Sequence, residues 1–369
     1  MQNVTRVEVR TLNAFHVGLQ CDRMYRRQFF SALTAALAAT PLASRRAFAQ
    51  AAPTPSAPIR VQVNEVIVPV TVTDDKGRFV SNLDKADFRI FDEGKEQKID
   101  YFSRDRSQPV VAGFLLDMSN TMKIHWAKYQ DAASELVLNM VPGDPRFSGY
   151  LITYGSEKPE LQVDTTSDSE KLVEKIRKLK PAGGAAFFDA IYMACVNRKL
   201  VKGEPYEPRR ILVVIGDGHD TASKKSLGEV LELAQRNLIT IFAMSTAAFG
   251  FATDGDKNLE QLAGETGGRV EYPLNHLYKD VSGFLSTPSD DGNYALKVGT
   301  GGYAAEISGG IFKAVTDISG EVTTQYIIRY TPDTGGAVAA EKVFRKIKVN
   351  VALPNVKVRY RNGYYPVHG

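Results

Sequence analysis

The sequence predicts an α/β fold: a doubly wound, mostly parallel sheet in the middle of the chain, with a small antiparallel β-sandwich formed from both chain ends. Two apolar runs, residues 110–116 and 210–215, have the near-continuous hydrophobic composition of buried parallel strands. Helical and extended stretches alternate around them, as βαβ units require. Alternating apolar and polar residues at 59–73 and 323–330 indicate strands near both ends of the chain.

Composition limits the classes of function. The chain has 369 residues, 43% of them hydrophobic, which is enough for one large or two modest domains with a sizeable core. Its net charge of +4 comes from seven arginines in residues 1–49, where Glu8 and Asp22 are the only acids. Removing these nine residues from the totals of 46 and 42 leaves 39 basic and 40 acidic residues, so we expect no binding to nucleic acid. Of the two cysteines, we expect Cys21 to leave with a leader and Cys195 to be a buried, unpaired thiol.

Residues 1–50 are expected to be a signal peptide. Arg26 and Arg27 stand in a twin-arginine-like motif that follows Met24, the expected start, and Ala47 and Ala49 fit a small-residue cleavage site. A general secretory signal and an unstructured cytosolic arm are the alternatives. The apolar run is short and rich in Ala and Thr, so we expect an exported protein, periplasmic or secreted, with no transmembrane span in the mature chain.

The two ends of the mature chain are expected to pair with each other. Residues 51–58 form a Pro/Ala linker, and residues 59–106 are the N-terminal part of the sandwich. Its strands are predicted at 59–73, 88–91 and 97–102. Such a small unit is marginal alone. Residues 321–369 are therefore expected to complete it with strands at 323–330, 343–351 and 356–360.

The α/β domain is expected over residues 107–320. Its strands are predicted at 110–116, 147–154, 160–164, 210–215, 239–245 and 269–272. Its helices are predicted at 124–140, 168–180, 187–200, 225–237, 257–266 and 275–286. Residues 286–303 are rich in Gly, Ser and Asp and predict a mobile inserted loop. A closing helix at 304–318 is expected to break early at the glycine pair 309–310.

Polar side chains follow two of the predicted strands. Asp117, Ser119 and Thr121 come after the first apolar run, and Asp217 follows the run 210–215. In an open parallel sheet the carboxyl ends of the strands face the ligand site, so these side chains are expected to converge. Oxygen donors without His or Cys favour a hard cation, Mg²⁺ first, with Mn²⁺ or Ca²⁺ as alternatives.

Together with a glycine turn at 181–186, these residues resemble the von Willebrand factor type A domain and its metal-ion-dependent adhesion site. The resemblance spans 108–320 and implies a metal bound by Asp117, Ser119, Thr121 and Asp217, directly or through water. The family's threonine in the second loop falls on Ala185, which has no side-chain oxygen. Water or a backbone carbonyl would then fill that position. The whole chain is similar to the acidobacterial type A-related secreted proteins.

Further residues are expected beside the ion without necessarily binding it: Gly184, Ala185, Asp189, His219 and Asp220. Each has an alternative structural role. Asp189 lies early in a helix, where a carboxylate is favoured by the helix dipole. His219 is expected to be an exposed loop residue, and the glycines of the second loop to serve the turn.

The sequence therefore predicts an exported, non-enzymatic interaction or adhesion protein whose metal site receives an acidic residue of a protein partner. No Gly-x-Ser-x-Gly elbow or His-Glu-x-x-His motif is present. Two alternatives stay open. One is a metal-dependent hydrolase of envelope material that uses Asp217, His219 and Asp220, and the other is a metal-free scaffold in which Ala185 records loss of the site. The sequence does not indicate the partner's identity or the oligomeric state.

Overall fold

The computed structural model describes the chain from residue 65 to residue 366. Excluded from that range are 105–107, 124–125, 156–157, 198–199, 201–207, 248–252, 275–290 and 334–342; for 291–306 only the helical backbone is described. The expected signal peptide, the linker and the helix predicted at 275–286 lie outside the described residues.

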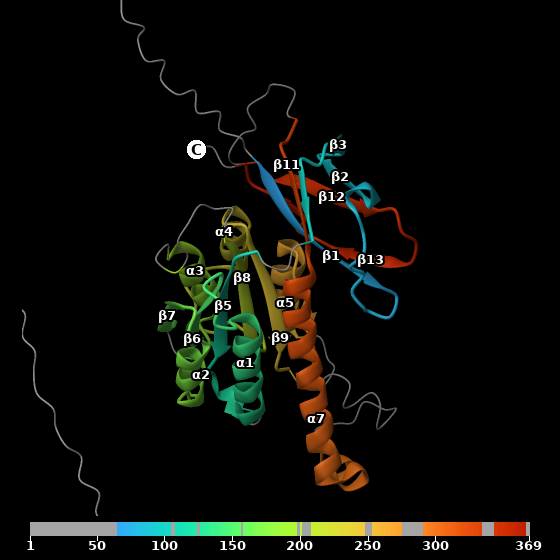
Figure 1. Ribbon diagram of the computed structural model, residues 1–369. Helices are drawn as coiled ribbons and strands as arrows, with labels where there is room; N and C mark the ends of the chain where they lie inside the picture. The colour runs from blue at the N-terminus through green and yellow to red at the C-terminus, as the bar shows by residue number, and fades with distance from the viewer. Residues whose placement is uncertain are drawn as a thin grey trace, which may run out of the picture. The chain divides into compact units, whose positions relative to one another are not determined.

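The central sheet has six strands in the order β10-β9-β8-β5-β6-β7 (Figure 1). Their bounds are β5 Val110–Asp117, β6 Phe147–Tyr154, β7 Glu160–Thr166, β8 Arg209–Gly216, β9 Ile239–Ser245 and β10 Val270–Glu271. The pairing between β6 and β7 is antiparallel, and every other pairing in this sheet is parallel. The predicted doubly wound, mostly parallel sheet is confirmed.

Helices cover both faces of this sheet. They are α1 Trp126–Met140, α2 Ser169–Arg177, α3 Phe187–Val196, α4 Leu227–Arg236, α5 Asp254–Thr266 and α7 Asp291–Thr324. Successive side chains of a strand point to opposite faces. In β5, Phe114 and Leu116 accordingly belong to a core cluster with residues of α1, α2 and α7, and Leu115 belongs to a second cluster with residues of α3, α4 and α5. Cys195 of α3 is a free, buried thiol in the second cluster, as expected.

The helix α7 corrects one prediction. Residues 291–303, expected to form a mobile loop, belong to this helix, which also runs without interruption through Gly309 and Gly310. Glycine lowers helix stability by about 1 kcal/mol relative to alanine but does not prevent a helix. A Cβ at Gly310 would collide with the Pro273 carbonyl, so close packing explains that glycine. The helix extends to Thr324, which delays the predicted strand 323–330 to Tyr326.

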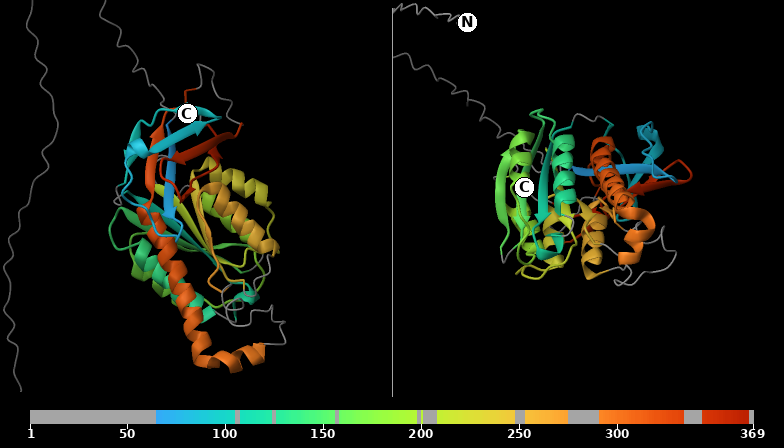
Figure 2. Two further views of the ribbon diagram at one scale, coloured as in Figure 1. Left: turned by 90° about the vertical axis from the view of Figure 1, so that its right-hand side faces the viewer. Right: turned by 90° about the horizontal axis from the view of Figure 1, so that it is seen from below.

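Two four-stranded antiparallel sheets combine strands from both ends of the described chain (Figure 1, Figure 2). The orders are β13-β1-β11-β4 and β14-β12-β2-β3. The bounds are β1 Val66–Asp74, β2 Phe88–Asp92, β3 Lys95–Gln97, β4 Tyr101–Ser103, β11 Tyr326–Tyr330, β12 Arg345–Val351, β13 Val356–Arg359 and β14 Gly363–Tyr364. Residues of both sheets share one hydrophobic cluster, which supports the predicted sandwich.

Three details of these sheets differ from the predictions. The strand predicted at 97–102 is divided between β3 and β4, and β14 has no predicted counterpart. The alternation in β1 predicts one buried face, yet Val66 to Thr73 are all buried. On the second face of β1, Ile67 and Pro69 lie beside residues of β8, with which they line a small cavity, and Thr71 accepts a hydrogen bond from Gln325 at 3.2 Å.

Candidate functional site

The site begins where β5 ends, at Asp117. The side chain of Asp117 is fully buried. Its Oδ1 accepts the backbone N–H of Ser119 at 2.7 Å, a short turn that fixes the carboxylate just beyond the strand. Its Oδ2 is buried and has no hydrogen-bond partner among the described residues. A buried carboxylate oxygen without a donor is costly, so this atom marks a place where a ligand would be stabilising.

Two hydroxyls stand beside this carboxylate. The Oγ of Ser119 and the Oγ1 of Thr121 are 2.7 Å apart. The glycine turn is tied to the same loop, because the N–H of Asn120 donates to the Gly183 carbonyl at 3.1 Å. Gly183 has a φ of +105°, a conformation that favours glycine. The first and second loops therefore meet at the edge of the sheet.

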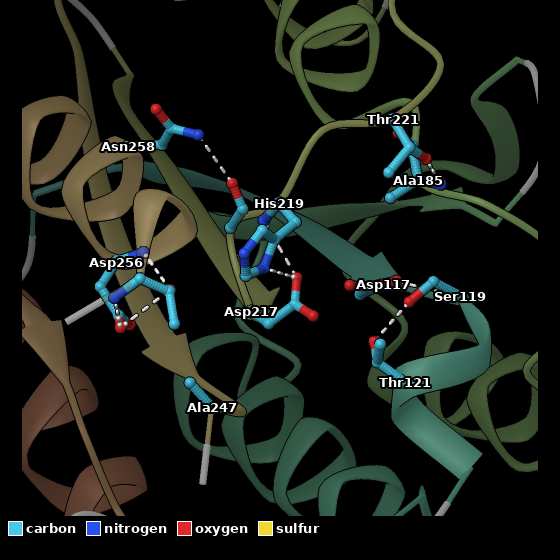
Figure 3. A network of polar contacts seen from close by, with 12 residues as sticks. Asp117, Ser119, Thr121, Ala185, Asp217, His219, Thr221, Ala247, Asp256 and Asn258 are labelled. Atoms are coloured by element: carbon cyan, nitrogen blue, oxygen red, sulfur yellow. Dashed lines mark hydrogen bonds and ion pairs between the residues drawn. The ribbon is translucent and has the colours of Figure 1, made fainter. Parts of the chain in front are cut away.

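Asp217 reaches the same place from the end of β8. It is 9% exposed, and its Oδ1 accepts the N–H of His219 at 3.0 Å. A Cβ at Gly216 would lie 3.1 Å from Asp117 Oδ2, so β8 and β5 deliver their ends side by side. The side chains of Asp117, Ser119, Thr121 and Asp217 face one another in Figure 3.

The surroundings make Asp117 an unusual acid. The pKa of its carboxyl is raised to about 6, chiefly by burial and in smaller part by the neighbouring charge of Asp217, while the hydrogen bonding of Ser119 and the nearby backbone N–H of Asp217 lower it. Tyr154, at the end of β6, presents a buried hydroxyl that has no hydrogen-bond partner among the described residues. A Cβ at Gly216 would collide with this hydroxyl, which places it beside Asp117. Burial raises the pKa of Tyr154, so it stays a neutral phenol.

The second loop contributes backbone rather than a side-chain oxygen. Ala185 is buried, and its N–H donates to Thr221 Oγ1 at 2.9 Å (Figure 3). Its carbonyl accepts the N–H of Thr221 at 2.8 Å. A Cβ at Gly184 would stand 3.1 Å from that same Thr221 hydroxyl. The hydroxyl of Thr221 thus lies beside the position where the family has its threonine, engaged with the backbone of Ala185.

Asp189 and Asp220 hold loops through hydrogen bonds that they accept from backbone N–H groups. The Oδ1 of Asp220 accepts the N–H of Phe187 at 2.9 Å, and so caps α3, whose own N-cap residue provides no side-chain cap. The carboxylate of Asp189 accepts the N–H groups of Lys224 and Lys225 at 3.0–3.2 Å. Both carboxylates lie at the positive end of α3, where capping and the helix dipole favour them.

His219 is the exposed neighbour of Asp217. Its side chain is 45% exposed, and its Nδ1 lies 3.3 Å from Asp217 Oδ1. The loop that carries it packs closely on the start of α5, because a Cβ at Gly255 would stand 2.8 Å from the His219 ring. The expected exposed loop position of His219 agrees with this exposure. Its closeness to Asp217 helps to orient that carboxylate.

A polar hollow adjoins the first loop and was not predicted. It encloses about 230 Å³, and Met118, Thr153 and Ala182 are among the residues that line it. Exposed Lys158 and Lys180 also line it, and the only acidic residue in the lining is Glu160. The Glu160 carboxylate accepts an amide hydrogen bond from Gln162 at 2.9 Å. The hollow therefore has a net positive lining next to the candidate site.

The donor set fits a hard cation. Two carboxylates and two hydroxyls are all oxygen donors, which Mg²⁺, Mn²⁺ and Ca²⁺ accept. Within the described part of the chain, no three His, Cys, Asp or Glu side chains gather as they would in a zinc or many-carboxylate calcium site. The same part of the chain contains no helix long and apolar enough to span a membrane.

Sequence reasoning missed Tyr154 and Thr221. Tyr154 is the partner of Asp117 in the parallel register of β5 and β6, a signal that appears only once the strands are aligned. Thr221 is four residues beyond Asp217, but its contact with Ala185 depends on how two loops cross. No pattern along the chain reports that crossing.

Residues 113–280 match the family model described as the von Willebrand factor type A domain. No curated protein matches the sequence. Among solved structures, an aerotolerance-related membrane protein from Bacteroides fragilis is 18% identical over 45% of this chain and 94% of its own, with a TM-score of 0.36. The VWA domain of SpRpn10 is 17% identical over 44% of this chain and 86% of its own, with a TM-score of 0.34.

A third similar structure is that of proximal thread matrix protein 1 from the mussel byssus, with a zinc-occupied metal-ion-dependent adhesion site motif. It is 16% identical over 46% of this chain and 43% of its own, with a TM-score of 0.37. The matched range contains five of the six strands of the central sheet in full and most of β5. Residues 113–280 are therefore a von Willebrand factor type A domain, a member of a family of protein-interaction modules that often carry a metal-ion-dependent adhesion site.

Proposed function

We propose that this chain is an exported, non-enzymatic interaction protein that binds a protein partner through a divalent cation held by Asp117, Ser119, Thr121 and Asp217. The observation that carries the proposal is the buried Oδ2 of Asp117, which has no hydrogen-bond partner among the described residues and faces two hydroxyls and a second carboxylate. A cation offsets the cost of burying these charges. When bound, it would offer an open coordination position to a partner's carboxylate.

Mg²⁺ is the first choice of ion, with Mn²⁺ or Ca²⁺ next. Ala185 brings no oxygen, so one ligand of the family's site is missing from the side chains. Mg²⁺ keeps several waters in protein sites, so a lost hydroxyl weakens binding without abolishing it. If no divalent cation changes the thermal stability of the chain, the alternative of a metal-free scaffold is supported instead.

The partner is expected to present an acidic segment. The positively lined hollow beside Met118 adds two exposed lysines, Lys158 and Lys180, to the charge of the cation. Charge complementarity at such a rim speeds association and selects acidic partners. One carboxylate would complete the cation's shell, and neighbouring acidic residues would lie over the hollow.

The hydrolase alternative is less well supported. It needs Asp220 as a ligand or a base, but Asp220 accepts the N–H of Phe187 and caps α3. His219 faces Asp217 from a solvent-exposed position. We therefore favour binding over turnover.

Export rests on residues 1–50 and remains a prediction, and the similarity of the whole chain to acidobacterial secreted proteins is a prediction as well. The N-terminus of the mature protein tests export. We expect mass spectrometry of the protein from its native envelope or culture medium to find a chain that begins close to residue 50. A chain that retains Arg26 and Arg27 in the cytoplasm would contradict export.

The metal proposal is tested by calorimetric titration with Mg²⁺ and Mn²⁺. We expect saturable binding by the wild-type chain and none by Asp117→Ala. Asp189→Ala is the matched control, because it also removes a carboxylate near the site but one that holds backbone N–H groups. Unchanged binding by Asp117→Ala would remove the metal from the proposal.

The partner proposal is tested by capture from envelope extract with and without chelator. We expect chelator-sensitive capture that a Lys158→Glu, Lys180→Glu double variant weakens at least tenfold, while its Mg²⁺ titration stays within about threefold. Lys171→Glu, a charge reversal at an exposed position on α2, is the control. Capture that is insensitive to both chelator and charge reversal would contradict an acidic partner at this site.

A further inference from the structure

Tyr154 ends β6 in the same cross-strand row as Asp117. The parallel register of β5 and β6 pairs these two residues with each other. On the other side of Asp117 lies Gly216 of β8, where a Cβ would stand 2.8 Å from the Asp117 Cβ. Partners in one row of a parallel sheet point to the same face of the sheet. A phenol, a carboxylate and a residue without a side chain therefore lie side by side where the three strands end.

The hydroxyl of Tyr154 lies over this glycine, close to the Asp117 carboxylate. A Cβ at Gly216 would collide with the hydroxyl and would stand 3.1 Å from Asp117 Oδ2. The tyrosine ring is fully buried and packs on Phe187 of α3, with 5.4 Å between the ring centroids. Packing of the ring, and the room left by Gly216, therefore hold the hydroxyl next to Oδ2.

Neither of these two oxygens has a hydrogen-bond partner. The hydroxyl of Tyr154 and Oδ2 of Asp117 are both buried, and neither is paired within the described part of the chain. Their burial also keeps them from bulk water, which would otherwise hydrogen-bond to them. Burying a polar atom without a partner is unfavourable. A hydroxyl donor and a carboxylate acceptor that lie this close can satisfy each other.

The phenol is the donor of this pair. Burial, and in smaller part the charges of three nearby aspartates, raise the pKa of Tyr154 well above its ordinary value, so it keeps its proton at neutral pH. The three aspartates are Asp117, Asp217 and Asp220. Of these, Asp117 has a carboxylate oxygen that is buried without a partner among the described residues. Oδ2 of Asp117 is therefore the acceptor open to this hydroxyl.

We propose that Tyr154 is a positioning residue of the candidate cation site, whose hydroxyl donates a hydrogen bond to Oδ2 of ionised Asp117. This role rests on the proposed cation site and adds a residue that does not itself touch the ion. The N–H of Ser119 already holds Oδ1 at 2.7 Å, so a donor at Oδ2 fixes the second oxygen and with it the plane of the carboxylate.

The same hydrogen bond leaves Asp117 able to bind. Each carboxylate oxygen has two lone pairs, so Oδ2 can accept the phenol and still offer one lone pair to the cation or to a water bound to it. A hydrogen bond to an ionised carboxylate is about twice as strong as one between neutral groups. The contact with Tyr154 therefore favours the ionised form of Asp117, which is the form that binds a cation.

Calorimetric titration of the Tyr154→Phe chain with Mg²⁺ tests this role. We expect the affinity to fall about tenfold, because hydrogen-bond partners of metal-binding side chains typically contribute about 10–100-fold in affinity. With chelator present, the melting temperature should stay within about 2 °C of the wild type, because no hydrogen bond of the hydroxyl is found in the described residues for the substitution to remove. A lower melting temperature with unchanged affinity would assign Tyr154 a packing role only and would overturn the proposal.

Tyr150→Phe is the matched control. Tyr150 lies four residues earlier in β6, belongs to the same hydrophobic cluster as Tyr154 and is 2% exposed. It is about 13 Å from Tyr154 along the strand, so its variant should keep the wild-type affinity for Mg²⁺. Equal losses of affinity in the two variants would show that any lost phenol in this cluster weakens the site, and would also overturn the proposal.

The wild-type titration separates this role from the proposed function. If the wild type binds no Mg²⁺, the cation site is removed, and this role of Tyr154 with it. If the wild type binds Mg²⁺ and Tyr154→Phe binds it equally well, the role of Tyr154 alone is overturned. Should Tyr154→Phe fail to fold, a crystal structure of the Mg²⁺-loaded wild type decides. Tyr154 Oη within about 3 Å of Asp117 Oδ2 would support the hydrogen bond, and a separation beyond hydrogen-bond distance would overturn it.

Discussion

Asp117 combines burial, a missing hydrogen-bond donor and a second carboxylate nearby, and each of these opposes its ionised form. Because the folded-state pKa of about 6 lies above the ordinary value of 3.8, the folded chain holds this proton more tightly than the unfolded chain. The resulting stabilisation is complete below about pH 4 and is lost as the pH rises to 6. At pH 7 and without metal, ionised Asp117 costs about 3 kcal/mol of folding stability.

The Asp117→Asn variant makes this cost measurable. In the presence of a chelator we expect it to be about 1–2 kcal/mol more stable than the wild type at pH 7.5, because the buried charge is gone while the contact with the Ser119 N–H is kept. At pH 4 the advantage should disappear. Urea unfolding at the two pH values measures it, and Asp189→Asn is the control. A variant less stable than the wild type at pH 7.5 would contradict the assigned pKa.

Ala185 permits a gain-of-function test. We expect Ala185→Thr to raise the affinity for Mg²⁺ about tenfold, because it adds a hydroxyl where the second loop has none. Ala185→Val adds the same volume at this buried position without an oxygen, and should show the same loss of stability but no gain in affinity. Calorimetric titration of both variants measures the difference. Equal affinities for the two variants would mean that this loop does not reach the ion.

At the residue scale, the sequence predicted site residues where a polar side chain directly follows a strand. Asp117 and Asp217 could be predicted because each follows an apolar run, and parallel strands bring their carboxyl ends to one edge. Tyr154 and Thr221 could not, because their proximity depends on strand register and on the crossing of two loops. Asp189 and Asp220 were predicted to lie beside the ion because they are near site residues in the sequence. Nearness in sequence does not show whether such a carboxylate binds the ion or accepts backbone N–H groups, as these two do.

At the scale of elements, loop 217–225 and the start of α3 behave as one unit. Asp220 caps α3, the N–H of Asp189 donates to Ser223 Oγ at 2.9 Å, and Ala185 exchanges hydrogen bonds with Thr221. Three separate links therefore join the second and third loops. The position of Asp217 beside Asp117 depends on these links as well as on the sheet.

The Asp220→Ala variant tests this coupling. We expect a loss of about 1 kcal/mol of stability from the removed cap, together with a weaker affinity for Mg²⁺, because both loops that frame the site are loosened. Asp168→Ala is the matched control: Asp168 caps α2 by accepting the N–H of Lys171, so the variant should lose similar stability but keep its metal affinity. Thermal melts and calorimetry give the two quantities. Equal effects on metal affinity in both variants would contradict the coupling.

Most elements of the central sheet could be predicted because periodicity and burial agree there. The strand β9, predicted at 239–245, is a fully buried parallel strand that is apolar except for Thr240 and Ser245. Composition was a poor guide for α7, where glycines at 309 and 310 suggested a break. The helix continues there because Ile311, Ile318 and other residues pack in the core. Gly310, which has no Cβ, also fits closely against the Pro273 carbonyl.

At the scale of the whole molecule, the chain-end sheets are joined to the type A domain by charged and aromatic side chains. The guanidinium of Arg236 on α4 lies 4.0 Å from the ring centroid of Tyr365. The backbone of Arg361 approaches Gly267, and Glu321 of α7 pairs with Arg359 of β13. Sequence periodicity predicted that both ends of the chain would pair, but these contacts involve isolated residues with no periodic signal.

Glu321 is the centre of the strongest of these junctions. It is fully buried, and its Oε2 lies 2.7 Å from Arg359 and 3.2 Å from Arg269. Arg269 also pairs with Glu271 and Asp317, so Arg359 depends most on Glu321. Removing one partner of a buried ion pair typically costs about 3–5 kcal/mol, because the remaining charge is left uncompensated. We therefore expect Glu321→Gln to destabilise the chain by about 3 kcal/mol. Chemical denaturation measures this loss.

Asp317→Asn is the control for that experiment, because Asp317 contacts Arg269 at 3.3 Å from a position that is 25% exposed, where water screens the pair. We expect it to cost less than about 1 kcal/mol. Adding Arg359→Met to Glu321→Gln should recover part of the loss, since one unpaired cation is then removed together with its partner. A Glu321→Gln variant as stable as Asp317→Asn, or no recovery in the double variant, would show that apolar packing rather than this carboxylate holds α7, β10 and β13 together.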